Sequence, residues 1–138
     1  MTLSRQEIFN LALNGIRAQN YKQSLNEGGH CAYRGHDGLK CGIGHCIDDD
    51  LAHLMDKGTA CGMTAIQFLL REDEEDFKSA PALRRIFRIE DADFLANVQF
   101  AHDTMDQDYI QKTPQEAFES AMEAVAENYS LVYAAPQA

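Results

Sequence analysis

The stretch "TPQEAFESAMEAVAENY", residues 113–129, has the local signals of an amphipathic helix. Thr113 provides an N-cap oxygen, Pro114 takes the first helical position, and Glu116 completes a capping box. The apolar residues that follow recur every three or four positions and predict one buried face: Phe118, Ala121, Met122, Val125, Ala126 and Tyr129. We expect this helix to pack on other helices.

Two further segments have the same pattern. Ser4 and Glu7 form a second capping box, and an apolar stripe follows it: Ile8, Leu11, Ala12 and Ile16. The segment "EDADFLANVQFAHDTM", residues 90–105, predicts a helix whose inner face places His102 on the core side, together with Phe94, Leu95, Val98, Ala101 and Met105. These segments predict the body of the domain.

Shorter helices are predicted between them. "DDDLAHLMDKG", residues 48–58, has acids at its start, Leu51, Leu54 and Met55 facing inward, and Gly58 at its end. "TAIQFLLREDEEDF", residues 64–77, begins at Thr64, and "SAPALRRIFR", residues 79–88, begins with Ser79 as N-cap. We therefore predict a mainly α single domain, residues 1–138, of about five or six helices, with a loose tail at 134–138.

The stretch "GGHCAYRGHDGLKCGIGHCIDDD", residues 28–50, breaks the helical pattern. It holds three of the four cysteines, three of the five histidines and six of the nine glycines. Asp37-Gly38 is a turn signal, while Gly42 and Gly44 favour a bulge or a close backbone approach. We predict a short Gly/Cys-rich β-hairpin or an irregular loop over residues 30–45.

Charge and composition narrow the classes of function. The net charge of −10 argues against direct binding to a nucleic-acid backbone, but it permits a basic protein partner or mimicry of DNA. No apolar run is long enough to span a membrane, and the N-terminus lacks the layout of a secretory signal. We expect a cytoplasmic protein with no membrane partner, in which the cysteines stay reduced.

A metal site is one interpretation of the cysteines and histidines. The candidate zinc ligands are Cys31, Cys41, Cys46 and His102, the last arriving from the 90–105 helix. The cysteine spacing contains no close C-x2-C pair, which a zinc turn usually has. The alternative is that small thiols fill a glycine-rich corner, so the expected cofactor is none, with zinc left open.

A thiol enzyme is a second interpretation. Cys41 would be the nucleophile, Gly42 to Gly44 would offer N–H groups to an oxyanion, and His102 would be the base. Adjacent helical residues point in different directions, so Asp103 is not expected to orient His102. The alternative for His102 is a core histidine bonded to a carbonyl of the glycine-rich loop.

Binding residues are predicted at two places. Arg34 and Asp37 lie at the turn of the glycine-rich segment, where an arginine suits a carboxylate or phosphate. Its alternative role is a clamp onto Asp48 or Asp103. Glu72, Glu74 and Glu75 belong to "REDEEDF", either an acidic docking surface or a solvated face.

"CAYRGHDGLKCGIGHCIDDD", "VQFAHD" and "AENYSLV" together resemble an uncharacterised group of small proteins from tailed phages and bacterial genomes. That group shares a C-x-YRG-x-DG-x-KCA-x-G-x-LI-x-DE stretch and a later helix containing HD. Here Gly42 replaces an alanine and Cys46 a leucine, which weakens a zinc site that uses Cys46. The resemblance implies a phage or prophage setting and no reaction.

Two functions are therefore predicted, from different classes. The first is an acidic accessory protein that binds a host or defence-system protein. The second is a thiol- or metal-dependent enzyme, hydrolase-like, centred on Cys41 and His102.

Overall fold

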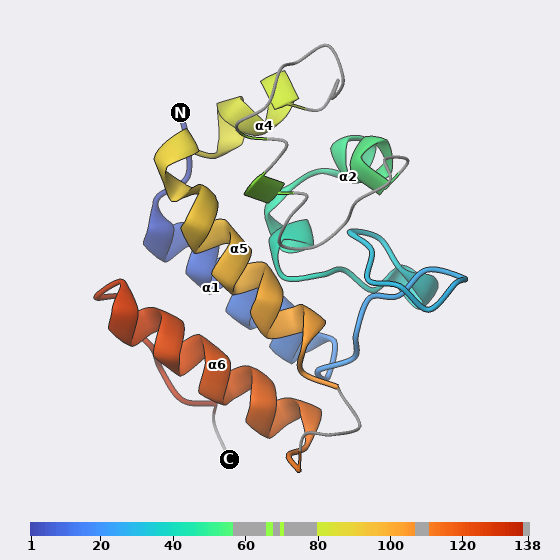
Figure 1. The fold of residues 1–138 in the computed structure, drawn as a ribbon, viewed down its shortest axis with the longest axis vertical. Coiled ribbons are helices and arrows are strands. Elements are labelled where there is room, and N and C mark those ends of the chain that lie inside the picture. Colours follow the sequence, from blue (N-terminus) through green and yellow to red (C-terminus); the bar gives the residue numbers. More distant parts are fainter. Residues whose placement is uncertain (57–65, 68–69, 71–79, 107–110, 137–138) are drawn as a thin grey trace.

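The structure is a computed structural model that describes residues 1–56, 66–67, 70, 80–106 and 111–136. Its named helices are α1 (Arg5–Ala18), α2 (Asp49–Asp56), α4 (Ala80–Ile86), α5 (Ala92–Asp103) and α6 (Pro114–Asn128) (Figure 1). Single 3-10 turns lie at His36–Gly38, Ile43–Cys46 and Ile89–Asp91. The prediction of a mainly α fold is confirmed.

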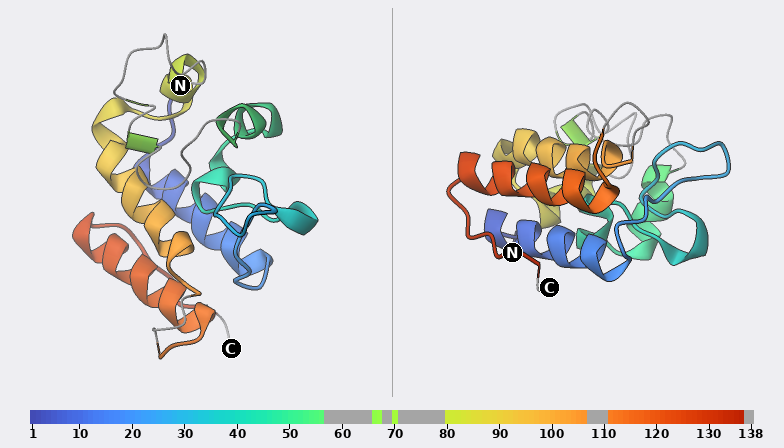
Figure 2. Two further views of the ribbon diagram at one scale, coloured as in Figure 1. Left: turned by 45° about the vertical axis from the view of Figure 1, so that its right-hand side comes forward. Right: turned by 90° about the horizontal axis from the view of Figure 1, so that it is seen from below.

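Helices α1, α5 and α6 form the body of the domain. α5 and α6 lie side by side, and α1 packs behind them in a second layer (Figure 2). Both predicted capping boxes are present, at Ser4 with Glu7 and at Thr113 with Glu116. Most residues of α5 are buried, because α1, α6 and the glycine-rich segment each cover part of it. His102 is fully buried, as its place in the predicted stripe requires.

The predicted apolar faces are too wide at two positions. Leu11 is 42% exposed and Leu54 is 40% exposed, although both were expected to face inward. The inner faces run instead through Ala12 and Leu13 in α1, and through Leu51, Ala52 and Met55 in α2. Each helix meets its neighbours along one narrow strip, which leaves the flanking leucine in solvent.

The glycine-rich segment is the irregular loop and not the hairpin. Its ladder consists of isolated antiparallel bridges, Leu25 with Cys31 and Arg34 with Lys40. The chain turns at Asp37 and Gly38, whose φ values are 57° and 74°, so the turn lies where the sequence predicted it. A Cβ on Gly44 would lie 2.8 Å from the carbonyl oxygen of Tyr33. This close approach explains the glycine and ends regular pairing.

The C-terminal segment folds back over the helices. Leu131 and Tyr133 pack against the core, and the carbonyl of Ala134 accepts a 2.7 Å hydrogen bond from Arg17 Nη2. The predicted loose tail therefore begins no earlier than Ala135. No helix in the described ranges is long and apolar enough to cross a membrane.

Several predictions lie outside the described residues. They concern the end of the predicted 48–58 helix at Gly58, most of the 64–77 segment with its start at Thr64, and the N-cap at Ser79. The predicted acidic docking residues Glu72, Glu74 and Glu75 also lie there.

Candidate functional site

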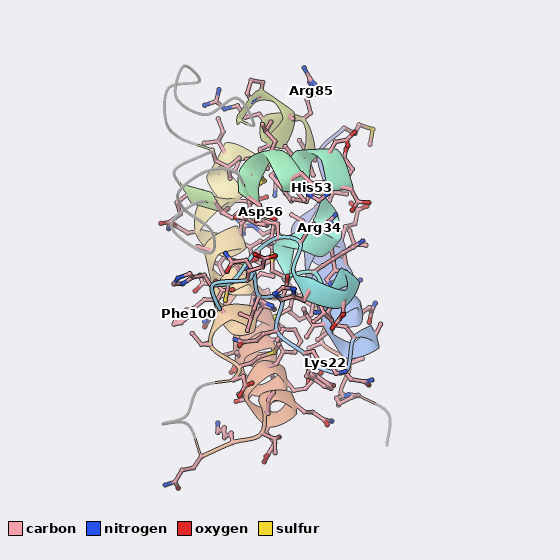
Figure 3. All side chains as sticks on the ribbon, turned by 90° about the vertical axis from the view of Figure 1, so that its right-hand side faces the viewer. Lys22, Arg34, His53, Asp56, Arg85 and Phe100 are labelled. Carbon is pink, nitrogen blue, oxygen red and sulfur yellow. The ribbon has the colours of Figure 1, made fainter. Side chains whose placement is uncertain are left out.

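Arg34 is a clamp inside the glycine-rich segment. Its Nη1 donates to the carbonyls of Tyr33 and Gly44, both at 2.9 Å, and its Nη2 donates to the carbonyl of Ile47, also at 2.9 Å. Its Nε donates to Asp49 Oδ1 at 2.7 Å. Figure 3 shows Arg34 between α2 and the loop. Each guanidinium nitrogen has a partner within the fold.

The acid that Arg34 binds differs from both candidates. Asp48 caps α2 by accepting the N–H of Leu51 at 2.8 Å, and Asp103 belongs to another network. Asp49, in the first turn of α2, takes the place of both. The hydrogen bond from Arg34 lowers the pKa of the Asp49 carboxyl. Asp37, the other predicted binding residue, is exposed at the turn.

His102 has a partner at each ring nitrogen. Its Nε2 accepts the backbone N–H of Ser24 at 3.0 Å, and its Nδ1 lies 2.7 Å from Asp103 Oδ1. A backbone N–H only donates and a carboxylate only accepts, so the neutral ring with its proton on Nδ1 satisfies both bonds. In this tautomer the ring lone pair, on Nε2, already accepts the N–H of Ser24.

Two expectations about His102 are wrong. Asp103 does orient the ring, although it is the next residue in the helix, because it is the last residue of α5 and its carboxylate turns back. The ring also bonds to the N–H of Ser24, and not to a carbonyl of the glycine-rich loop.

Gln99 connects this pair to the glycine-rich segment. Its Nε2 donates to Asp103 Oδ1 at 2.9 Å, while its Oε1 accepts the N–H of Ile43 at 3.1 Å. Gln99 is almost fully buried, so its own amide needs these two partners inside the fold. Sequence analysis missed Gln99, although its position four residues before Asp103 places both on one helix face.

Cys41 lies in the core. It is fully buried, and its sulfur accepts the N–H of Gly44 at 3.2 Å. Burial, with the negative charge of Asp103 as a second cause, raises the pKa of the Cys41 thiol well above its ordinary value. Of the expected oxyanion donors, the N–H groups of residues 42 to 44, those of Ile43 and Gly44 are bonded within the fold. This geometry supports a packing role for Cys41.

The residues that could bind a metal together in the structure differ from the predicted zinc ligands. Ligand atoms of Cys31, His102 and Asp103 lie within 4.8 Å of one another. Cys31 is partly exposed, so this group is reachable from solvent. Cys46 lies elsewhere, with its sulfur 3.8 Å from the carbonyl of Ile8, and burial raises its pKa to about 12. Cys46 and Cys41 are free thiols.

A second polar cluster lies between α1 and α6, and sequence analysis missed it. The carboxylate of Glu119 accepts two bonds from Arg17, at 2.7 and 2.8 Å, and one each from Tyr21 and Tyr133. Burial opposes ionisation of Glu119, but these bonds outweigh it and keep its pKa below the ordinary value. The sequence signal that could have indicated it is the position of Glu119, three residues before Met122 and therefore on the apolar face of the helix.

A buried carboxylate also anchors the start of α5. Asp91 is fully buried and pairs with Arg5 at 2.7 Å and with Arg88 at 3.0 Å. Arg88 lies in "LRRIFR", residues 83–88, which also contains Arg84 and Arg85. The bond to Asp91 assigns Arg88 a part in holding the fold.

Comparison of the chain with protein-family models, with curated proteins and with solved structures finds no match. The resemblance to the phage and bacterial group stays a prediction.

Proposed function

We propose that this chain is a small acidic accessory protein of the phage or prophage type that binds a host or defence-system protein in the cytoplasm. One observation carries the proposal. The side chains best suited to ligand or catalytic chemistry, namely Arg34, Cys41 and His102, form their bonds inside the fold. These bonds support a scaffold role for the buried part of the glycine-rich segment, and we place the function on exposed residues.

The net charge of −10 indicates what that surface would attract. A negative protein speeds the approach of a positively charged partner and repels the nucleic-acid backbone. A basic patch on a host protein, including one that normally holds DNA, is the matching chemistry. The proposed docking residues are Glu72, Glu74 and Glu75, with Asp37 at the exposed turn.

Affinity capture tests the proposal. The tagged full-length chain is incubated with a bacterial lysate, and captured proteins are identified by mass spectrometry. A triple charge reversal, Glu72→Lys with Glu74→Lys and Glu75→Lys, should abolish capture and leave the melting temperature unchanged. The control variant replaces three other exposed acids, Glu27, Asp50 and Asp106, with lysine. It has the same net charge as the first variant and should still capture the partner. Unchanged capture by the first triple would count against that docking face.

The alternative function is thiol- or metal-dependent chemistry, and the geometry moves its centre from Cys41 to Cys31. The supporting observation is the proximity of Cys31 to His102 and Asp103. Zinc takes sulfur, imidazole and carboxylate ligands, and these three would leave one coordination position open. Coordination by His102 would require the ring to give up its bond to Ser24 or to Asp103, which weighs against this alternative.

Native mass spectrometry after zinc addition separates the two functions. Extra mass that is lost on denaturation and in Cys31→Ser, but kept in Cys41→Ser, would favour the metal site. A bare chain mass for all three proteins would leave protein binding as the function.

A further inference from the structure

The chain turns back after α6 and passes behind this helix (Figure 1). Residues 131–134, the return segment, are bound there through their main chain. Gln6 Oε1 accepts the N–H of Val132 at 2.9 Å, and Gln6 Nε2 donates to the carbonyl of Val132 at 3.1 Å. Arg17 Nη2 donates to the carbonyl of Ala134 at 2.7 Å. Such contacts to main-chain groups are those with which a protein binds a peptide.

The side chains of the return segment alternate between the protein and solvent. Leu131 and Tyr133 pack against the core, whereas Val132 between them is 75% exposed. The hydroxyl of Tyr133 donates to Glu119 Oε1 at 2.7 Å, and Arg17 Cζ lies 5.8 Å from the centroid of the Tyr133 ring. The segment is therefore recognised by two of its side chains as well as by its main chain.

The turn that joins the return segment to α6 contains an unusual backbone angle. Ser130 has a φ of 55°, in the left-handed region that residues other than glycine rarely adopt. The N–H groups of Ser130 and Leu131 bond to carbonyls at the end of α6. The bonds to Gln6, Arg17 and Glu119, which together form the seat of the segment, reach at least 14 positions along the chain. The bonds of the seat therefore do not depend on the turn.

We propose that two copies of this chain exchange their return segments, so that each segment occupies the seat of the other copy and the turn at Ser130 opens. A second copy has the same segment and can form the same bonds in the seat. Exchange of an identical element keeps these contacts and releases the left-handed angle. Residues 130–138, "SLVYAAPQA", contain no charged side chain, so the exchange brings no further acid to Glu119. The proposal is independent of the binding of a host protein.

Concentration decides between the closed monomer and the exchanged dimer. In the monomer the short connection holds the segment near its seat at an effective concentration on the order of millimolar, so the unchanged chain should be monomeric well below it. The net charge of −10 on each copy also opposes pairing, and salt screens this repulsion. The fraction of dimer should therefore rise with salt, whereas the docking of a basic partner should weaken.

Ser130→Pro in the full chain should favour the exchange. Proline holds φ near about −65° and has no N–H, so it cannot form this turn. Sedimentation velocity at about 0.1 mM, below that effective concentration, should show dimers for Ser130→Pro and monomers for the unchanged chain. Ser130→Gly is the matched control and should stay monomeric, because glycine adopts a φ of 55° readily. Adding Tyr133→Ala to Ser130→Pro should weaken pairing about tenfold or more, because it removes the aromatic anchor.

NMR on a mixture of isotope-labelled and unlabelled Ser130→Pro chains identifies the contact itself. Signals between Tyr133 of one copy and Arg17 of the other should appear. A Ser130→Pro chain that keeps its helical circular dichroism and stays monomeric, whether its seat is empty or filled by a segment of another protein, would overturn the exchange. So would a dimer that survives Tyr133→Ala.

A second measurement covers the case in which Ser130→Pro does not fold. The same mixed-label experiment is then made on the unchanged chain, concentrated into the millimolar range where exchange competes with the closed form. Signals between copies at Tyr133 would support the exchange, and their absence would overturn it.

Discussion

The Nδ1–H group of His102 donates a hydrogen bond to the carboxylate of Asp103, the next residue in the chain, with 2.7 Å between Nδ1 and Oδ1. The same carboxylate oxygen accepts from Gln99, and the opposite ring nitrogen accepts from Ser24. Backbone groups at Ser24 and Ile43 are thereby tied to the C-terminal end of α5. A histidine paired with an acid in a cleft would indicate catalysis. Here the pair joins the segment at Ser24 to the end of α5.

Asp103→Ala should destabilise the fold by about 1–3 kcal/mol, because it leaves His102 and Gln99 without their shared acceptor. Urea unfolding followed by circular dichroism measures the change. Asp106→Ala, an exposed acid three residues on, is the control and should stay within about 0.5 kcal/mol of the unchanged chain. Equal losses for the two variants would contradict the network.

Gly15→Ala should destabilise α1, against the usual direction. Alanine in a helix is ordinarily more favourable than glycine by about 1 kcal/mol. Here a Cβ at position 15 would overlap the imidazole ring of His45, which is half-buried against the helix. We expect a net loss of about 1–3 kcal/mol in unfolding free energy. Asn14→Ala, exposed on the same helix, should be neutral or slightly stabilising, and a stabilising Gly15→Ala would refute this packing.

Stability should fall as the pH drops from about 6.5 to about 4, because of His45. Burial, with Lys40 as a lesser cause, lowers the pKa of His45 to about 4. Its ordinary pKa is about 6.5, so between these values the unfolded chain binds a proton that the folded chain excludes. His45→Gln should flatten this part of the profile of unfolding free energy against pH. A profile of the same slope in both proteins would show that His45 does not contribute.

Cysteine labelling should separate Cys31 from Cys41. Iodoacetamide reacts with an accessible thiolate, and Cys31 is partly exposed while Cys41 is fully buried with a raised pKa. Peptide mass spectrometry should find Cys31 modified first, with Cys41 protected until the chain unfolds. In addition, Cys41→Ser should lower the melting temperature and Cys31→Ser should not. Early labelling of Cys41 would reopen its role as a nucleophile.

The helices were predicted well because their signals are local. A hydroxyl at Ser4 or Thr113 and an acid three residues later close a capping box with their own backbone, whatever the rest of the chain does. The buried faces of α5 and α6 follow from side-chain spacing in the same way. Leu11 and Leu54 were misplaced because spacing does not say how wide a strip the neighbouring helix covers.

The sequence by itself determined the helical class, the caps of α1 and α6, the turn at Asp37-Gly38 and the burial of His102. Only the tertiary structure decided the partner of each polar side chain. Arg34 binds Asp49 and not Asp48. Glu119 of α6 binds Arg17 of α1, which lies 102 positions earlier in the chain. A hydrogen bond depends on ångström distances between segments far apart in the chain, and residue spacing carries no measure of those distances.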